Sequence, residues 1–177
     1  MKYVTSFAFV VSLGMISACG GSDSPGMPAT PSGSGVQTFT AALRPSEEVP
    51  PISGAESAGS GTATITLNAT KDSSGNITSA TATFVVNLTG FPAGTPINMA
   101  HIHQAPAGQS GNVVVSTTLS PGDVTLDGGG GSFNRSGIAV TPDIASQLMT
   151  NPAGFYFNVH STLNPGGVAR GQLVRVQ

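Results

Sequence analysis

The sequence predicts an all-β domain, an antiparallel sandwich or barrel of Greek-key type with about seven or eight strands and one short helix. Three observations predict this fold. Apolar and polar residues alternate in several short segments, which is typical of strands with one buried face. Clusters of Gly, Pro, Asn and Asp separate these segments as turns. Helical spacing of apolar residues occurs in one segment, so the predicted helix content is small.

The composition limits the classes of partner. Only 14 of the 177 residues are charged, which is 8%, whereas about 25% is usual for a soluble domain. The formal net charge is −2 and basic residues do not cluster, so we expect no nucleic-acid partner. The single cysteine excludes an intrachain disulfide and a cysteine-based zinc site. The length fits one domain.

The N-terminal residues have the features of a targeting segment. Residues 1–18 have the form of a signal peptide: Lys2, an apolar run too short to span a membrane, and then small residues. The sequence ISACG at 16–20 resembles the lipobox of bacterial lipoproteins, in which the cysteine, here Cys19, is acylated, for example with palmitate. Gly20 is similar to the residue that follows this cysteine in lipoproteins sorted to the outer membrane. We therefore expect a protein that is lipid-anchored to the cell envelope; the alternative is an ordinary secreted protein.

A tether is expected to follow the anchor. Residues 19–35 are the cysteine and a segment of Gly, Ser and Pro with almost nothing to bury. A flexible chain of this length has a root-mean-square reach of about 20–24 Å. The folded domain is therefore expected at residues 36–177, clear of the membrane surface.

Alternation identifies the clearest strands. Within 62–67, Ala63, Ile65 and Leu67 share one face and three threonines share the other. Residues 78–88 alternate in the same way, and in 155–160 Phe and Val oppose Tyr, Asn and His. The face away from the core is therefore expected to be wet, and to consist of Thr, Ser and Asn rather than of charges.

Turn and capping residues separate the elements. Residues 71–76, KDSSGN, predict a hairpin between two strands. Asp127 and the four glycines after it predict a second turn, between 122–126 and 132–140. The short helix is predicted over 142–150, with Thr141 as N-cap and Pro142 at the first position.

Three histidines are the main candidates for chemistry. On a strand, His101 and His103 point to the same side, with Met99 beside them, and His160 lies opposite the apolar face of its own segment. We expect all three to face away from the core, and to converge if their strands are neighbours. Three neutral imidazoles suit copper or zinc, and a nearby thioether favours Cu(I). The alternative is a structural role through hydrogen bonds to backbone carbonyls.

Several motifs, in order, resemble the CHRD domain, a family named from chordin and also found in bacterial secreted proteins. Residues 43–52 read LRPSEEVPPI, 61–63 GTA, 100–103 AHIH, 156–161 YFNVHS and 167–173 GVARGQL. The resemblance covers about residues 39–175. Pro45 stands where the family usually has Gly, and Val168-Ala169 where it usually has Glu-Ile, which puts any role of that glutamate in doubt here.

The resemblance implies a β architecture and no established catalytic activity. It therefore favours a binding or structural module of unknown ligand over an enzyme. The alternative is a copper-dependent oxidoreductase, because His-x-His followed by a late His is also similar to the copper half of Cu/Zn superoxide dismutases. The chain has no further histidine for a second metal half-site.

The other charged residues are weaker candidates for a functional role. Arg170 is expected to hydrogen-bond loop carbonyls, or else to bind an anion near the histidines. Glu47 and Glu48 are adjacent, so they point to opposite faces, and we expect them to serve turn and rim contacts.

Overall fold

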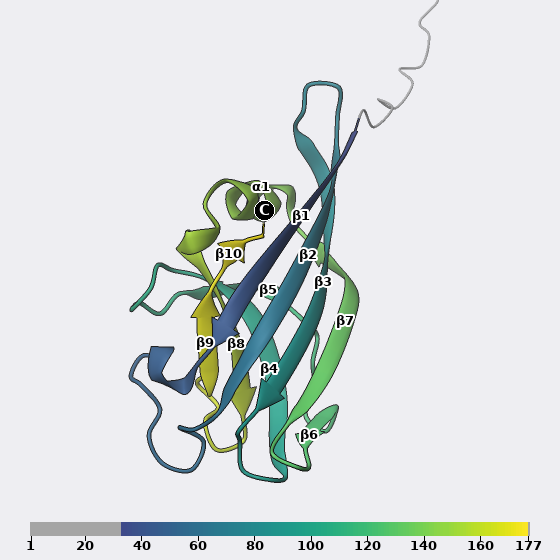
Figure 1. The fold of residues 1–177 in the computed structure, drawn as a ribbon. Helices are drawn as coiled ribbons and strands as arrows, with labels where there is room; N and C mark the ends of the chain where they lie inside the picture. Colours follow the sequence, from purple (N-terminus) through teal and green to yellow (C-terminus); the bar gives the residue numbers. More distant parts are fainter. Residues whose placement is uncertain (1–32, 177) are drawn as a thin grey trace, which may run out of the picture.

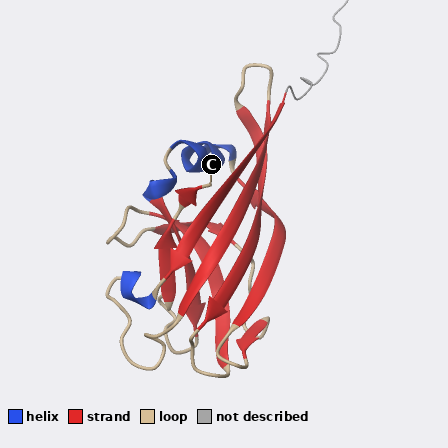
Figure 2. Ribbon diagram, in the orientation of Figure 1, coloured by secondary structure: helices blue, strands red, loops and turns tan. Residues whose placement is uncertain are grey.

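The computed structural model describes residues 33–176, which form two antiparallel sheets packed face to face (Figures 1 and 2). The predicted all-β fold is confirmed, as a sandwich. The signal peptide, Cys19 and most of the tether lie outside the described residues. The first sheet has the order β10 (Val174–Arg175), β1 (Gly33–Leu43), β2 (Ser60–Lys71), β3 (Ile77–Thr89), β7 (Gly131–Val140). The second has the order β5 (Asn112–Ser116), β4 (Thr95–Gln104), β8 (Phe155–Ser161), β9 (Ala169–Gln172), and β6 (Val124–Leu126) also pairs with β4.

The hairpin of β2 and β3 forms where the alternation predicted it. Its turn is closed by Asp72, whose carboxylate accepts hydrogen bonds from the backbone N–H groups of Ser74 and Asn76 at 2.9 Å each. β1 pairs with β2 along its whole length, from Gly33 opposite Lys71 to Leu43 opposite Gly61. Residues 33–35, expected in the tether, therefore begin β1, because β2 is long enough to pair with them.

The core lies between the sheets. The inward residues of β2 and β3 are those that the alternation predicted, with Ile65 and Leu67 each about 1% exposed. The second sheet contributes Ile97, Ile102 and the apolar residues of β8. Phe84 of β3 stacks on Phe157 of β8 with ring centroids 5.7 Å apart, so the two sheets interlock at the centre. Burying these apolar faces is the main source of stability.

The helix α1 (Pro142–Thr150) has the predicted bounds. The Thr141 hydroxyl accepts a hydrogen bond from the backbone N–H of Ile144 at 3.4 Å, which satisfies one free donor of the first turn. Ala145 and Leu148 are buried, so the helix closes one end of the sandwich (Figure 1). No helix within residues 33–176 is long and apolar enough to cross a membrane.

The number of strands was predicted too low. The structure has ten strands in residues 33–176, not seven or eight. β6 lies within the segment 122–126 that the sequence placed before the glycine turn. β10 has two residues, too short to show alternation, and β5 is five residues rich in valine. β5 and β10 pair with β4 and with β1, so tertiary pairing and not local pattern creates them.

A long connection between β1 and β2 runs beside the second sheet (Figure 1). It begins with a turn of 3₁₀ helix, η1 (Pro45–Glu47), which lies against β9. Arg44 and Arg170 form an isolated bridge there, with Arg44 N–H donating to the Arg170 carbonyl at 3.0 Å. We call residues 44–59 the strap. It brings acidic residues from an early part of the chain to the face that carries the histidines.

Candidate metal centre

Strand pairing brings the three histidines together. β4 and β8 are antiparallel neighbours, with His101 opposite Asn158, His103 opposite Tyr156, and Met99 opposite His160. Because alternate residues of a strand share a face, these six side chains form one layer on the outer side of the second sheet, and all except Met99 are polar. The register of β4 and β8 therefore brings the three histidine side chains close enough together for a metal site.

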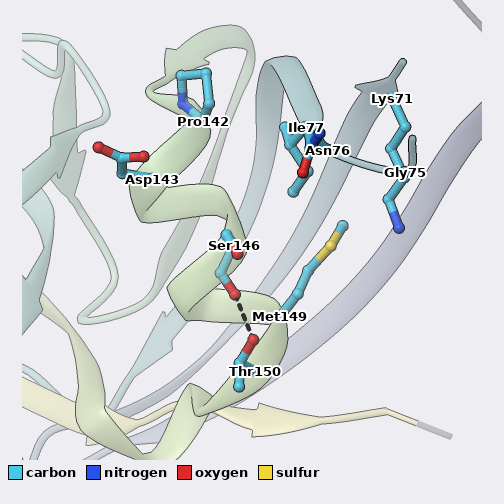
Figure 3. Close-up of a pocket in the computed structure, with 9 residues that line it drawn as sticks. All are labelled: Lys71, Gly75, Asn76, Ile77, Pro142, Asp143, Ser146, Met149 and Thr150. Carbon is cyan, nitrogen blue, oxygen red and sulfur yellow. Dashed lines mark hydrogen bonds between the residues drawn. The ribbon is translucent and has the colours of Figure 1, made fainter. Parts of the chain in front are cut away.

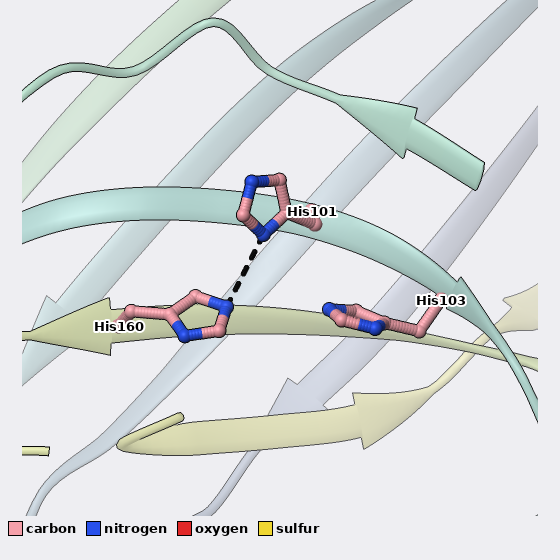
Figure 4. Close-up of side chains that lie close together, drawn as sticks. All are labelled: His101, His103 and His160. Carbon is pink, nitrogen blue, oxygen red and sulfur yellow. Dashed lines mark hydrogen bonds between the residues drawn. The ribbon is translucent and has the colours of Figure 1, made fainter. Parts of the chain in front are cut away.

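The imidazole nitrogens point toward a common centre (Figure 4). One ring nitrogen from each of the three histidines lies within 4.8 Å of the others. His101 Nδ1 and His160 Nε2 are 3.2 Å apart. Two nitrogens bound tetrahedrally to one ion at 2.0–2.1 Å are about 3.4 Å apart. Metal binding would therefore draw the nitrogens together by at most about 1.5 Å.

Backbone carbonyls fix which nitrogen is free in two of the rings. His103 Nδ1–H donates to the Gly111 carbonyl at 3.0 Å, and His160 Nδ1–H donates to the Pro165 carbonyl at 2.9 Å. A carbonyl only accepts, so in both neutral rings Nδ1 holds the hydrogen and Nε2 holds the lone pair. Metal-binding histidines in proteins usually donate a hydrogen bond from their second ring N–H group in this way.

His101 completes the set differently. Its Nδ1 faces the lone pair of His160 Nε2, so in the metal-free protein it donates a hydrogen bond to that atom. An ion placed among the rings would replace this bond, with the His101 proton on Nε2 instead. The two rings are held edge to face, with centroids 5.1 Å apart.

The surroundings keep the imidazoles neutral. Burial, together with the neighbouring His160 and His103 rings, lowers the pKa of His101 to about 4, and burial is the largest of these causes. Burial also lowers the pKa of His103 and of His160, although the hydrogen bonds to Gly111 and Pro165 act in the opposite direction. Neutral imidazole is the form that binds a metal, so the site needs no deprotonation at pH 7.

The outer face of β8 is buried, which corrects the prediction that this face is wet. His103 and His160 are only 8% and 6% exposed, and Tyr156 and Asn158 are buried with them. Loops cover the face: the strap, the segment 105–111 and the segment 162–168. Alternation correctly predicts that these side chains leave the core, but the loops that cover them come from remote parts of the chain.

A stack of three side chains closes one side of the site. The Tyr156 ring lies parallel to the His103 ring, with centroids 4.8 Å apart and an angle of 5°. The Arg170 guanidinium lies over Tyr156 at 4.6 Å from the ring centroid. Arg170 also donates to the carbonyls of Glu47 and Gln109, so it joins β9 to the strap and to the loop before β5.

Glu48 is buried, whereas the sequence predicted turn and rim contacts for both glutamates. Glu47 is exposed, as expected for its role, but Glu48 is 6% exposed and its carboxylate lies 3.9 Å from the Arg170 Nε. Burial raises the pKa of Glu48 to about 7, and the charge of Arg170 opposes this rise. One carboxylate oxygen, Oε1, has no hydrogen-bond partner. The two glutamates point to different environments, so they do not form an acid–base pair.

Glu56 is a site residue that sequence reasoning missed. It is 3% exposed, and its Oε2 accepts hydrogen bonds from the Ser161 hydroxyl at 2.7 Å and from the Asn164 side-chain amide at 2.5 Å. These partners are more than 100 positions away in the chain. The segment around Glu56 has no alternation and no known motif, so only the fold reveals the contact.

Two other hollows in the described residues do not join this centre. One, of about 350 Å³, lies between the β2–β3 turn and α1, and is lined by residues that include Lys71, Asp143 and Met149 (Figure 3). The other, also about 350 Å³, lies between the strap residues 48–53 and the loop 164–167. Pro165, whose carbonyl accepts the His160 Nδ1–H bond, lines this hollow, but none of the three histidines does.

The fold and the cluster of one half-buried and two buried histidines define the class: a β-sandwich domain with a candidate metal centre on one covered sheet face. The CHRD domain family model matches residues 39–173, which is most of the chain. The chain therefore belongs to the CHRD domain family. Comparison with curated proteins gave no match, and neither did comparison with solved structures.

Proposed function

We propose that this protein is a lipid-anchored cell-envelope module whose CHRD domain binds one copper or zinc ion through His101, His103 and His160. One observation carries the metal proposal: ring nitrogens of the three histidines lie close together, and hydrogen bonds to backbone carbonyls fix the tautomers of His103 and His160. Two Nε2 lone pairs are aimed inward because their Nδ1–H groups are tied to carbonyls at 3.0 and 2.9 Å. A structural histidine needs only the carbonyl bond, and the free Nε2 of buried His103 would then have no partner.

Calorimetric titration with Cu²⁺ and with Zn²⁺ tests the metal site. The protein is compared with a His101→Ala, His103→Ala variant, both with Cys19 replaced by Ser because a free thiol also binds these metals. We expect one ion per chain in the first and a loss of at least 100-fold in affinity in the second. Equal affinity in both proteins, or no binding in either, contradicts the proposal.

The anchor is supported by residues 1–20 of the sequence. Acylation of Cys19 would place the protein in the detergent phase after phase separation, and labelled palmitate would enter the chain. Cys19→Ser removes the acceptor, so the variant should move to the aqueous phase and take up no label. If wild type and variant partition alike, the protein is not a lipoprotein.

Metal binding does not by itself make an enzyme. Copper-loaded protein that binds its ion but does not turn over superoxide supports a binding or storage role. Rapid turnover that the His101→Ala, His103→Ala variant loses would instead support the oxidoreductase alternative.

A further inference from the structure

The loop after β8 contacts the His160 ring through a backbone carbonyl. The Pro165 carbonyl, which accepts the His160 Nδ1–H bond at 2.9 Å, belongs to the loop 161–167. This loop has its own hydrogen bonds: the Asn164 carbonyl accepts from the backbone N–H groups of Ser161 at 3.4 Å and Gly167 at 3.1 Å. The Ser161 hydroxyl accepts from the Asn164 N–H at 2.9 Å. The position of the Pro165 carbonyl therefore depends on how Ser161 and Asn164 are held.

Glu56 of the strap holds both of these residues from outside the loop. A single carboxylate oxygen accepts from the Ser161 hydroxyl and from the Asn164 amide. Glu56 and Ser161 are almost completely buried, and their contact joins the strap to the residue that directly follows His160. We propose that Glu56 is a positioning residue of the metal centre, which fixes the loop 161–167 and through it the Nδ1–H tautomer and the orientation of His160. The relevance to metal affinity rests on the proposed function.

The ionisable side chain at this position supports a role beyond packing. Within residues 33–176, the ion pairs are Arg135 with Asp123 and Arg170 with Glu48, so Glu56 has no cationic partner there. Burying a carboxylate without a cation costs free energy, and a glutamine oxygen would accept the same two bonds. The charge strengthens both bonds, because charged acceptors bind donors about twice as strongly as neutral ones. A firmer loop is the gain that offsets the cost of burial.

The test measures the tautomer of His160 in the metal-free protein by the ¹⁵N chemical shifts of its ring nitrogens. In the protein with glutamate at 56, we expect His160 to hold its hydrogen on Nδ1. In Glu56→Ala, we expect a mixture of the two tautomers. His103 serves as the internal control, because its Nδ1–H bonds Gly111 in a different loop and should be unchanged.

Three further variants, one of them a control, separate an effect on the position of His160 from an effect on folding. Glu56→Gln keeps an acceptor oxygen and should largely restore the His160 tautomer. Asn164→Ala removes the contact from the loop side, should leave the fold intact, and should change the His160 tautomer as Glu56→Ala does. Glu47→Ala, at an exposed neighbour in the strap, should change nothing.

Metal titration of the same variants gives the second readout. Direct outer-shell partners of a metal ligand are worth about 10–100-fold in affinity. Glu56 acts through the loop that holds Pro165, so we expect Glu56→Ala to weaken the affinity by about 10-fold, at the low end of that range, and Glu56→Gln to recover most of it. A His160 tautomer that is the same in wild type, Glu56→Ala and Asn164→Ala overturns the inference. If the wild type binds no metal, the proposed function fails, while the tautomer in the metal-free protein still decides whether Glu56 positions His160.

Discussion

The outer faces of the two sheets have the same pleated geometry but differ in burial. On the first sheet, threonines lie side by side across three strands, with Thr38, Thr66 and Thr83 in one row, and each of the three is partly exposed. On the second sheet, the corresponding face of β8 is buried along its whole length. Both faces point away from the core, but the second is covered by the strap and by two loops. The uncovered face is a solvated surface, whereas burial on the covered face shifts the pKa values of its ionisable side chains.

This difference shows what lowers the histidine pKa values and raises that of Glu48. Burial is the first cause in each case, and burial comes from loops rather than from the sheet. The low content of charged residues in the chain also fits this difference between the two faces. Hydroxyl and amide groups suffice on the open face, while the buried ionisable groups are concentrated under the loops.

The largest effect should come from breaking the cover at Gly167. A Cβ there would lie 2.6 Å from the Asn158 side-chain nitrogen and 2.8 Å from both Glu48 oxygens, and the backbone φ is 137°. Overpacking and a strained φ together should cost about 2–5 kcal/mol in Gly167→Ala. Urea unfolding measures this loss.

The neighbouring glycine is the matched control. At Gly166 a Cβ would meet nothing within 4 Å and φ is not in the left-handed region, so Gly166→Ala should change the free energy of unfolding by about 0.5 kcal/mol or less. Equal stability of the two variants would mean that the loop does not press on the covered face.

The next effect is a pH dependence of stability from Glu48. Its pKa rises from the ordinary 4.5 to about 7 in the folded protein. Between these values the folded carboxyl holds its proton while the unfolded one has lost it, so stability falls as pH rises, by about 3 kcal/mol in all. Glu48→Gln cannot titrate and should lack this fall.

The histidines titrate partly in the same range with the opposite sign, so the informative quantity is the difference between wild type and Glu48→Gln. The variant should gain stability over wild type from pH 4.5 to pH 8, as measured by urea unfolding at each pH. Glu47→Gln, at the exposed neighbour, should show no such gain. A constant difference across this range would place Glu48 in water, not under the strap.

The smallest effect should be on the open face. Thr64 of β2 is exposed and lies between Thr40 and Val85 on the neighbouring strands. Thr64→Ala should change the free energy of unfolding by only about 0.5 kcal/mol and leave metal affinity unchanged. A large loss of metal affinity in the titration, or of stability in urea unfolding, would show that this face is not a simple solvated surface.

Local pattern predicted much of the fold. β2, β3 and α1 lie where alternation and the Thr141-Pro142 cap placed them, because each is long enough to show its period. β5 and β10 were not separable from loops, since their pairing with β4 and β1 creates them. The start of β1 at Gly33 depends equally on its partner, Lys71 in β2.

The candidate site was predictable only in part. The spacing of His101 and His103 places them on one face, but their approach to His160 needs the register of two strands more than 50 residues apart. The burial of Glu48 and the contact of Glu56 with Ser161 depend on where the strap crosses the sheet. Such contacts have no local period, so a single sequence carries no signal for them.

The most direct test of the metal centre is the number of imidazoles on the bound ion. X-ray absorption of the copper- or zinc-loaded Cys19→Ser protein should show three imidazole nitrogens at about 2.0–2.1 Å. The His101→Ala, His103→Ala variant should lose that signature. An ion held by one imidazole or by none, with the three rings intact, would contradict the account and leave the covered histidines as structural groups.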